Sequence, residues 1–179
     1  MRIISGSHRG RKIIAPKNLP VRPTTDMAKE GLFNILYNYF HFEQVEVLEL
    51  FAGTGNIAYE FASRGSKNII AVDINLRCIS FIDRMARELE FSNIHTIKGN
   101  VFHILERIKQ TFDIIFADPP YDLQNIDKLP DLVFENKLLK NDGWLIIEHT
   151  KKLDFSSHQF YWQQRHYGNV YFSIFFHRS

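Results

Sequence analysis

Cysteine is nearly absent from this sequence, with Cys78 as the single example among 179 residues. One cysteine forms neither an intramolecular disulfide nor a cysteine-based zinc site, so we expect a reducing, cytoplasmic setting and interpret Cys78 as a packing residue. No apolar run reaches the roughly 18 residues that a membrane-spanning helix needs, and residues 1–6 lack the apolar stretch of a secretory signal. Repeats are lacking, and the eight histidines show no metal-ligand spacing. We therefore expect a protein without a membrane segment or a bound metal.

The chain has the length and composition of one globular domain, with 45% hydrophobic and 23% charged residues. Its net charge of +2 is unevenly distributed. Residues 1–40 carry seven Lys or Arg against two acidic residues, residues 41–150 carry eleven against seventeen, and residues 151–179 carry four against one. A basic flank on an acidic body predicts a face that contacts a polyanion, and a solvated basic tail is the alternative.

Strand-like and helix-like segments alternate from residue 45 onward. Strands are expected at 45–51, 68–73, 94–98, 112–117 and 144–148, and helices at 56–64, 76–89, 101–108 and 129–139. A β-hairpin around Tyr167-Gly168 completes the pattern of an α/β fold with a mostly parallel seven-stranded sheet. The sequence also predicts a basic hairpin or arm over residues 1–24, ahead of a compact domain over residues 25–179 that begins with a helix near Thr24.

Glycines follow the first parallel strand, in the run Glu49-Leu50-Phe51-Ala52-Gly53-Thr54-Gly55. They permit a sharp turn into a helix and the close approach of a ligand, which in such folds binds beyond the carboxyl ends of the strands. With Ala58 the run also satisfies a loose dinucleotide fingerprint. Glu49 would repel a pyrophosphate and attract an ammonium group, so it favours a cationic ligand. A tight turn without any ligand is the alternative.

Two further strands end in polar residues. Asp73 follows the first glycine of the turn by about 20 residues, a spacing at which a carboxylate can accept the hydroxyls of an adenosine ribose. Asn100, in Gly99-Asn100-Val101-Phe102, follows the third strand and could read the edge of an adenine. Capping of the next helix is the alternative role for both residues.

The most specific motif is Asp118-Pro119-Pro120-Tyr121, directly after an apolar strand. The prolines end the strand and stiffen the loop, so the Asp118 carboxylate and the Pro119 carbonyl become two fixed acceptors beside the flat ring of Tyr121. Acceptors on both hydrogens of an exocyclic amine direct its lone pair toward an electrophile and stabilise the positive charge that develops on nitrogen. A proline-rich loop in which Tyr121 only packs is the alternative.

The glycine-containing run at residues 49–55 and the motif at residues 118–121 together resemble those of class I S-adenosylmethionine-dependent methyltransferases that act on nitrogen. The runs Met1-Arg2-Ile3-Ile4-Ser5-Gly6, Arg9-Gly10-Arg11-Lys12 and Arg22-Pro23-Thr24-Thr25-Asp26 are similar to those of the RsmD family, the bacterial 16S ribosomal RNA methyltransferases that modify a guanine 2-amino group. The resemblance extends to Tyr167-Gly168-Asn169. It implies the Rossmann-like class I fold and S-adenosylmethionine as cofactor. It also implies 16S rRNA or a small-subunit assembly particle as partner of a cytoplasmic monomer.

The resemblance implies roles for individual residues. Contacts to the target guanine, and with them catalysis, are implied for Asp118, Pro119 and Tyr121. Contacts to the cofactor are implied for Glu49, Phe51, Gly53, Gly55, Asp73, Ile74, Asn100 and Val101. Contacts to RNA are implied for Arg2, Arg9, Arg11, Lys12 and Arg22. The chain departs from the family at Met27, which is often basic in relatives, and after Asp73, where many relatives carry a second acidic residue.

Three other functions stay open on the sequence. An adenine N6 methyltransferase for DNA or RNA shares the motif at residues 118–121. A nicotinamide-dependent oxidoreductase would use the glycine turn and Asp73, but it leaves residues 118–121 without a role. A non-catalytic RNA-binding module of ribosome assembly would bind RNA and no cofactor.

Overall fold

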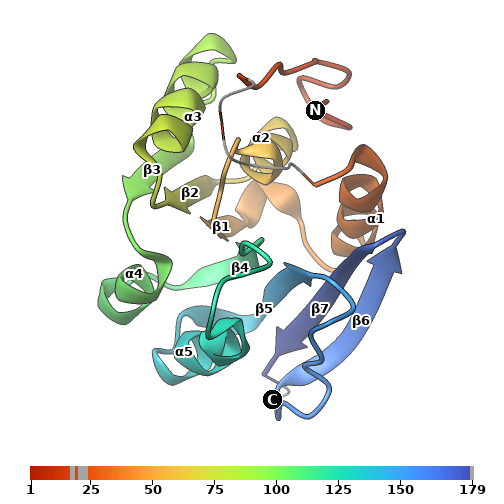
Figure 1. Cartoon of the computed structure of the whole chain (residues 1–179). Coiled ribbons are helices and arrows are strands. Elements are labelled where there is room, and N and C mark those ends of the chain that lie inside the picture. The colour runs from red at the N-terminus through yellow and green to blue at the C-terminus, as the bar shows by residue number, and fades with distance from the viewer. Residues whose placement is uncertain (17–18, 20–23, 178–179) are drawn as a thin grey trace.

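A single seven-stranded sheet forms the centre of the structure (Figure 1). The computed structural model describes residues 1–16, 19 and 24–177. The strands are β1 (Glu46–Leu50), β2 (Asn68–Asp73), β3 (Ile94–Lys98), β4 (Phe112–Ala117), β5 (Leu139–His149), β6 (Tyr161–Tyr167) and β7 (Val170–Phe176). Their order is β3-β2-β1-β4-β5-β7-β6. The first five strands pair in parallel, and β7 pairs antiparallel with its neighbours β5 and β6 on either side. The expected mostly parallel sheet with a C-terminal antiparallel hairpin is confirmed.

Helices cover both faces of this sheet, as the apolar strands require. The helices are α1 (Asp26–Tyr37), α2 (Asn56–Ser63), α3 (Leu76–Glu88), α4 (Val101–Arg107) and α5 (Leu129–Glu135), with short 3-10 turns η1 (Phe42–Gln44) and η2 (Ile126–Lys128). One apolar core lies between the sheet and α1, α2 and α3, and a second lies between the sheet and α4 and α5. Among the described residues, no helix is long and apolar enough to cross a bilayer.

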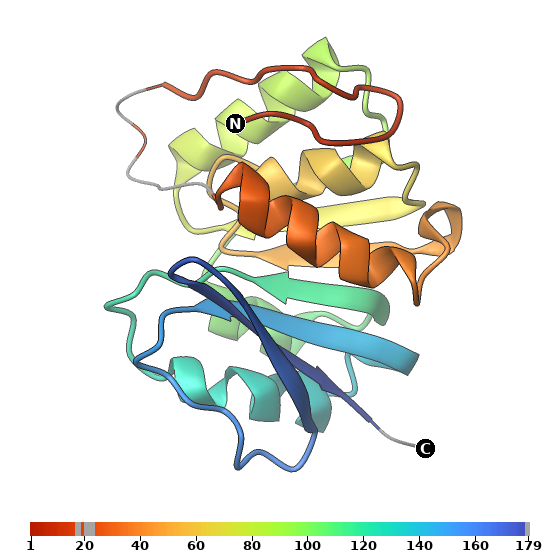
Figure 2. The same cartoon turned by 90° about the vertical axis from the view of Figure 1, so that its right-hand side faces the viewer.

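The N-terminal segment 1–16 packs against helix α2 (Figure 2). Its two arms form an antiparallel bridge between Arg2 and Lys12, and backbone hydrogen bonds between residues 1–3 and residues 10–13 hold them together. Ile3 and Ile13 are buried in the core, and the Glu60 carboxylate of α2 accepts the backbone N–H groups of residues 4 and 5. The exposed basic side chains of the segment are therefore held on an ordered backbone, while the domain boundary at residue 24 stays a prediction.

The boundary between α5 and β5 differs from the expectation. The helix expected over 129–139 ends at Glu135, and the strand expected from residue 144 begins at Leu139. Lys137 adopts a left-handed backbone conformation, with φ of 53°, which stops the helix. The Asp142-Gly143 turn lies inside β5 rather than before it, in an irregular stretch where the register against β4 shifts.

Candidate active site

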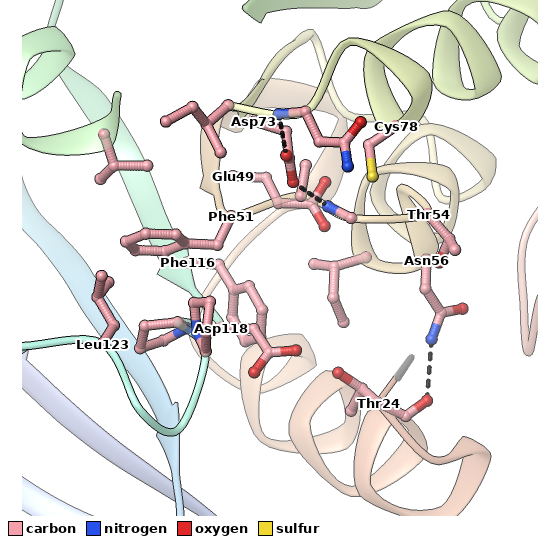
Figure 3. Close-up of a pocket in the computed structure, with 18 of the residues that line it drawn as sticks. Thr24, Glu49, Phe51, Thr54, Asn56, Asp73, Cys78, Phe116, Asp118 and Leu123 are labelled. Carbon is pink, nitrogen blue, oxygen red and sulfur yellow. Dashed lines mark hydrogen bonds between the residues drawn. The ribbon is translucent and has the colours of Figure 1, made fainter. Parts of the chain in front are cut away.

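A cavity of about 410 Å³ lies at the carboxyl ends of β1, β2 and β4 (Figure 3). This is where ligands bind to parallel α/β sheets. The cavity brings together nearly all the residues that the sequence predicted for the cofactor and the target base. These are Glu49, Phe51, Gly53, Asp73, Ile74, Asn100, Val101, Asp118, Pro119 and Tyr121.

Gly55 is the exception, because the residues that line the cavity do not include it. Gly55 precedes helix α2 with φ of +75°, a conformation that favours glycine. A Cβ atom here would lie 2.9 Å from side-chain atoms of both Tyr59 and Ile82. The structure therefore gives Gly55 a role in shaping the turn.

Four carboxylates lie on the α1–α3 face of the sheet, at the carboxyl ends of four neighbouring strands. The register pairs Ala117 of β4 with Ile147 of β5, so the residues that follow these two also lie side by side. Alternate residues of a strand point to the same face, and the registers of β1 and β2 extend the series across the sheet. In spatial order the four are Asp73, Glu49, Asp118 and Glu148.

Asp73 holds the glycine turn in place. Its Oδ2 accepts the backbone N–H of Gly53 at 2.8 Å, and its Oδ1 accepts that of Asn75 at 2.8 Å (Figure 3). The side chain that caps α3 belongs to Asn75, which accepts the N–H of Arg77. Asp73 is therefore not the cap of that helix, and each of its oxygens keeps a second lone pair for a ligand in the cavity.

Glu49 is almost fully buried, with 3% of its surface exposed. Its Oε2 accepts the backbone N–H of Ala58, in the first turn of α2, at 3.0 Å. Burial raises the pKa of Glu49 from 4.5 to about 8, and the nearby Asp73 carboxylate adds to the effect. Glu49 thus satisfies the amide of Ala58, so part of the helix N-terminus that would bind a phosphate is occupied.

Asp118 lies at the opposite end of the cavity from Asp73 (Figure 3). Burial raises the pKa of its carboxyl group well above the usual range, and the carboxylates of Glu148 and Glu49 raise it further. Pro119 is buried, whereas Tyr121 is 60% exposed. The motif therefore presents an acceptor inside the cavity and an aromatic ring at its mouth.

Asn100 and Val101 line the cavity at the end of β3. The Asn100 side-chain oxygen caps α4 by accepting the N–H of Phe102 at 2.9 Å. The structure therefore shows this oxygen as a helix cap, which was the alternative role, and the contact to adenine stays a prediction.

Sequence reasoning missed a chain of buried polar groups that connects α2 to the site. Lys29 Nζ donates to Asn56 Oδ1 at 2.8 Å and lies 3.4 Å from Glu60. Asn56 Nδ2 donates to the Thr24 carbonyl at 3.0 Å, and Thr24 Oγ1 donates to Glu148 Oε2 at 2.7 Å. Burial lowers the pKa of Lys29, while the Glu60 carboxylate opposes this effect.

The sequence signals for these residues were present but ambiguous. Thr24 belongs to Thr24-Thr25-Asp26, residue types that favour a helix N-cap; Thr25 caps α1 as this pattern predicts, while Thr24 bonds to Glu148 instead. Cys78, interpreted as a packing residue, is buried but also lines the cavity. Phe116 of β4 lines the cavity as well. The sequence alone does not show whether an apolar residue of a strand lines a cavity or packs in the core.

The residues predicted to contact RNA lie outside the cavity. Arg2, Arg9, Arg11 and Lys12 are exposed on the N-terminal segment. Arg2 Nε lies 3.5 Å from the Asp26 carboxylate. Arg22 falls outside the described residues.

The cavity is acidic. Its lining contains Glu49, Asp73 and Asp118, and no Lys or Arg of the described part of the chain contributes to it. The same described residues contain no group of three or more His, Cys, Asp or Glu side chains arranged to hold a metal ion. Carboxyl groups in a partly enclosed cavity favour a positively charged ligand, which stabilises their ionised form, over an anionic one.

Comparisons with known proteins agree with this arrangement. Residues 1–176 match the family described as Conserved hypothetical protein 95. The ribosomal RNA small subunit methyltransferase D of Buchnera aphidicola subsp. Acyrthosiphon pisum is 34% identical over 152 residues, which cover 84% of this chain and 78% of the relative. The protein of the same name from Haemophilus influenzae is 31% identical over 155 residues, which cover 84% and 79%.

A solved structure shares the whole fold. The structure of a hypothetical protein from Thermus thermophilus superimposes with a TM-score of 0.85 at 22% identity and covers 98% of each chain. The sequence motifs, the relatives and the fold therefore lead to one assignment. This chain belongs to the Conserved hypothetical protein 95 family, the RsmD family of the ribosomal RNA small subunit methyltransferases.

Proposed function

We propose that this protein transfers a methyl group from S-adenosylmethionine to the 2-amino group of a guanine in 16S ribosomal RNA. The observation that carries the proposal is the acidic cavity that joins Asp73, Glu49 and residues 118–121 in one site. Methyl transfer to ribosomal RNA is also the activity named for relatives that align with most of the chain. The partner is 16S rRNA or a small-subunit assembly particle, and we expect a cytoplasmic monomer.

The residues of the cavity fit S-adenosylmethionine. Asp73 offers lone pairs to the ribose hydroxyls, and the apolar side chains of Ile74, Val101 and Phe102 offer a surface to the adenine ring. Glu49 offers its carboxylate to the ammonium group of the methionine part. When bound, this cofactor supplies a methyl group activated by a positively charged sulfonium, a charge that the acidic cavity stabilises.

The same features argue against a nicotinamide cofactor. A dinucleotide places its pyrophosphate at the helix N-terminus after the glycine turn. Here the Glu49 carboxylate lies at that position and bonds to the N–H of Ala58. No described Lys or Arg lines the cavity to bind the negative charge of a pyrophosphate. The oxidoreductase alternative therefore fits the site less well than a methyltransferase does.

Asp118 and Pro119 prepare the amine for reaction. The Asp118 carboxylate and the Pro119 carbonyl accept the two hydrogens of the amino group, which turns the nitrogen lone pair toward the donor. Methyl transfer would form the nitrogen–carbon bond as the carbon–sulfur bond of the cofactor breaks, and the positive charge would pass from sulfur to the nitrogen that Asp118 and Pro119 hold. The nitrogen then loses a proton to the Asp118 carboxylate that already accepts one of its hydrogens, and no strong base is needed because the alkylated, positively charged amino group of a purine is very acidic.

Tyr121 and the basic segment would bring the base to this point. Enzymes that modify a base commonly take it out of its stack, and the exposed ring of Tyr121 offers a stacking surface at the mouth of the cavity. Arg2, Arg9, Arg11 and Lys12 are exposed on the outside of the molecule, where the phosphates of an RNA can reach them.

Identification of the product tests the proposal. Purified protein is incubated with unmodified 16S rRNA, and separately with small-subunit particles, in the presence of labelled S-adenosylmethionine. Mass spectrometry of the digested RNA should show N2-methylguanosine. N6-methyladenosine would support the adenine alternative, and RNA binding without methylation would support the assembly module. Asp118→Ala serves as the inactive control.

A further inference from the structure

A second cavity, of about 330 Å³, adjoins the first at the mouth of the site. Pro119 and Tyr121 line both cavities, so the two spaces meet at the motif that holds the target base. The second cavity is also lined by Glu148 and by the exposed Lys151 and Lys152. A nucleobase stacked on Tyr121 would therefore face this cavity with one of its edges.

Glu148 is the polar group best placed to meet that edge. It is 3% exposed, it lies beside Asp118 in the sheet, and Thr24 Oγ1 donates to its Oε2 at 2.7 Å. This bond engages Oε2, so Oε1 is the oxygen that the carboxylate offers to a ligand. The hydroxyl of Thr24 thereby fixes the orientation of the group.

We propose that Glu148 selects guanine by accepting its N1–H, while Asp118 and Pro119 accept the hydrogens of the neighbouring 2-amino group. The inference rests on the proposed function and deepens it by assigning the choice of base to one residue. Lys151 and Lys152, at the rim of the second cavity, take the role of neutralising the phosphates that flank the extruded base.

The pattern of donors on guanine matches the pair of carboxylates. N1–H and the 2-amino group are adjacent donors on the Watson–Crick edge, the edge by which an extruded base is read. Adjacent strands of a sheet are about 4.8 Å apart, so carboxylates on neighbouring strands can each accept from one of two adjacent donors. Adenine carries an unprotonated N1 on this edge, and its lone pair would face the buried Glu148 carboxylate. The site therefore accepts guanine and rejects adenine.

A base analogue and an isosteric variant test this assignment together. The methylated position is first mapped with wild-type protein, and RNA is then prepared with guanine or 2-aminopurine at that position. The analogue keeps the 2-amino group but has no N1–H. Wild-type protein should prefer guanine by about a hundredfold or more in kcat/KM, as expected for loss of a buried hydrogen bond. Glu148→Gln should lower this preference at least about tenfold, because its amide can donate to the N1 of the analogue.

Controls make each outcome decisive. Glu135→Gln, the same change at an exposed position at the end of α5, should leave the preference unchanged. A preference in Glu148→Gln within about twofold of wild type would overturn the assignment. If Glu148→Gln does not fold, Thr24→Val is used instead, because it removes the hydroxyl that orients the Glu148 carboxylate. It should lower the preference several-fold, and an unchanged preference would overturn the assignment. Wild-type protein that makes no methylated guanine would instead refute the proposed function itself.

Discussion

Replacement of the buried Glu49 by glutamine should change both the pH dependence of stability and the binding of the cofactor. Burial raises the pKa of this carboxyl from 4.5 to about 8. Between pH 4.5 and about 8 the folded protein keeps a proton that the unfolded chain has lost. The contribution of Glu49 to stability is therefore greatest below the unfolded-state pKa and is lost as the pH rises through the folded-state pKa. At about 1.4 kcal/mol per pH unit, the full loss amounts to about 5 kcal/mol. Glu49→Gln removes this contribution and keeps an acceptor for the N–H of Ala58.

Denaturant unfolding from pH 5 to pH 8.5 measures the effect. The free energy of unfolding of Glu49→Gln, minus that of wild type, should increase by about 3–4 kcal/mol over this range. Subtraction isolates Glu49 from Asp118 and Glu148, whose pKa values are also raised. Glu135→Gln, at an exposed position, should show no such trend. A difference that stays constant with pH would refute the reasoning.

Binding of a cationic ligand should stabilise the ionised form of Glu49 and so lower the pKa of this group. We expect S-adenosylmethionine to release close to one proton from this group at pH 7, because its ammonium group stabilises the carboxylate. Calorimetry in two buffers of different ionisation enthalpy counts the protons. Glu49→Gln should bind more weakly and release about one proton less. Equal proton release by both proteins would place the cation elsewhere.

The remaining predictions concern the base, the RNA and the fold. Asp118→Ala should reduce methyl transfer to background while calorimetry shows cofactor affinity within a few-fold of wild type; retained activity would contradict the mechanism. Tyr121→Ala should cost about 1–3 kcal/mol in kcat/KM, less than Asp118→Ala, if stacking is its role. Arg11→Ala should reduce the slope of log affinity for RNA against log salt by about 1, measured by titration, if this side chain contacts one phosphate. Gly6→Ala should destabilise the protein by more than about 1 kcal/mol in denaturant unfolding, because φ is +83° there and a Cβ would overlap the Ser63 carbonyl; wild-type stability would show that the segment does not pack on α2.

The sequence was sufficient to predict the order and type of the sheet elements. Apolar runs such as 69–72 and 114–117 are typical of strands covered on both faces, and both lie in strands of the structure. The end of α5 was wrong because Leu138 and Leu139 continue the apolar pattern, while the left-handed backbone of Lys137 stops the helix. Backbone conformation at a lysine is not readable from periodicity.

The site was predictable where it follows directly from the ends of strands. Glu49, Asp73 and Asp118 lie at or next to the ends of strands. Glycines follow Glu49 and prolines follow Asp118, which makes these strand ends easy to recognise. Ligands of parallel sheets bind at the carboxyl ends of the strands, so all three are expected at one edge. Glu148 also lies one residue before the end of its strand, but no glycine or proline follows to mark it, so its position beside Asp118 depends on the strand register. Thr24 meets Glu148 across 124 residues, a contact that only the folded chain reveals.

The central claim is that the acidic cavity holds the sulfonium donor beside Asp118. A crystal structure of the protein with S-adenosylhomocysteine tests it most directly. We expect the ribose hydroxyls on Asp73, the amino group near Glu49, and the sulfur facing the Asp118 carboxylate. A ligand bound outside this cavity, or with its sulfur turned away from Asp118, would contradict the account.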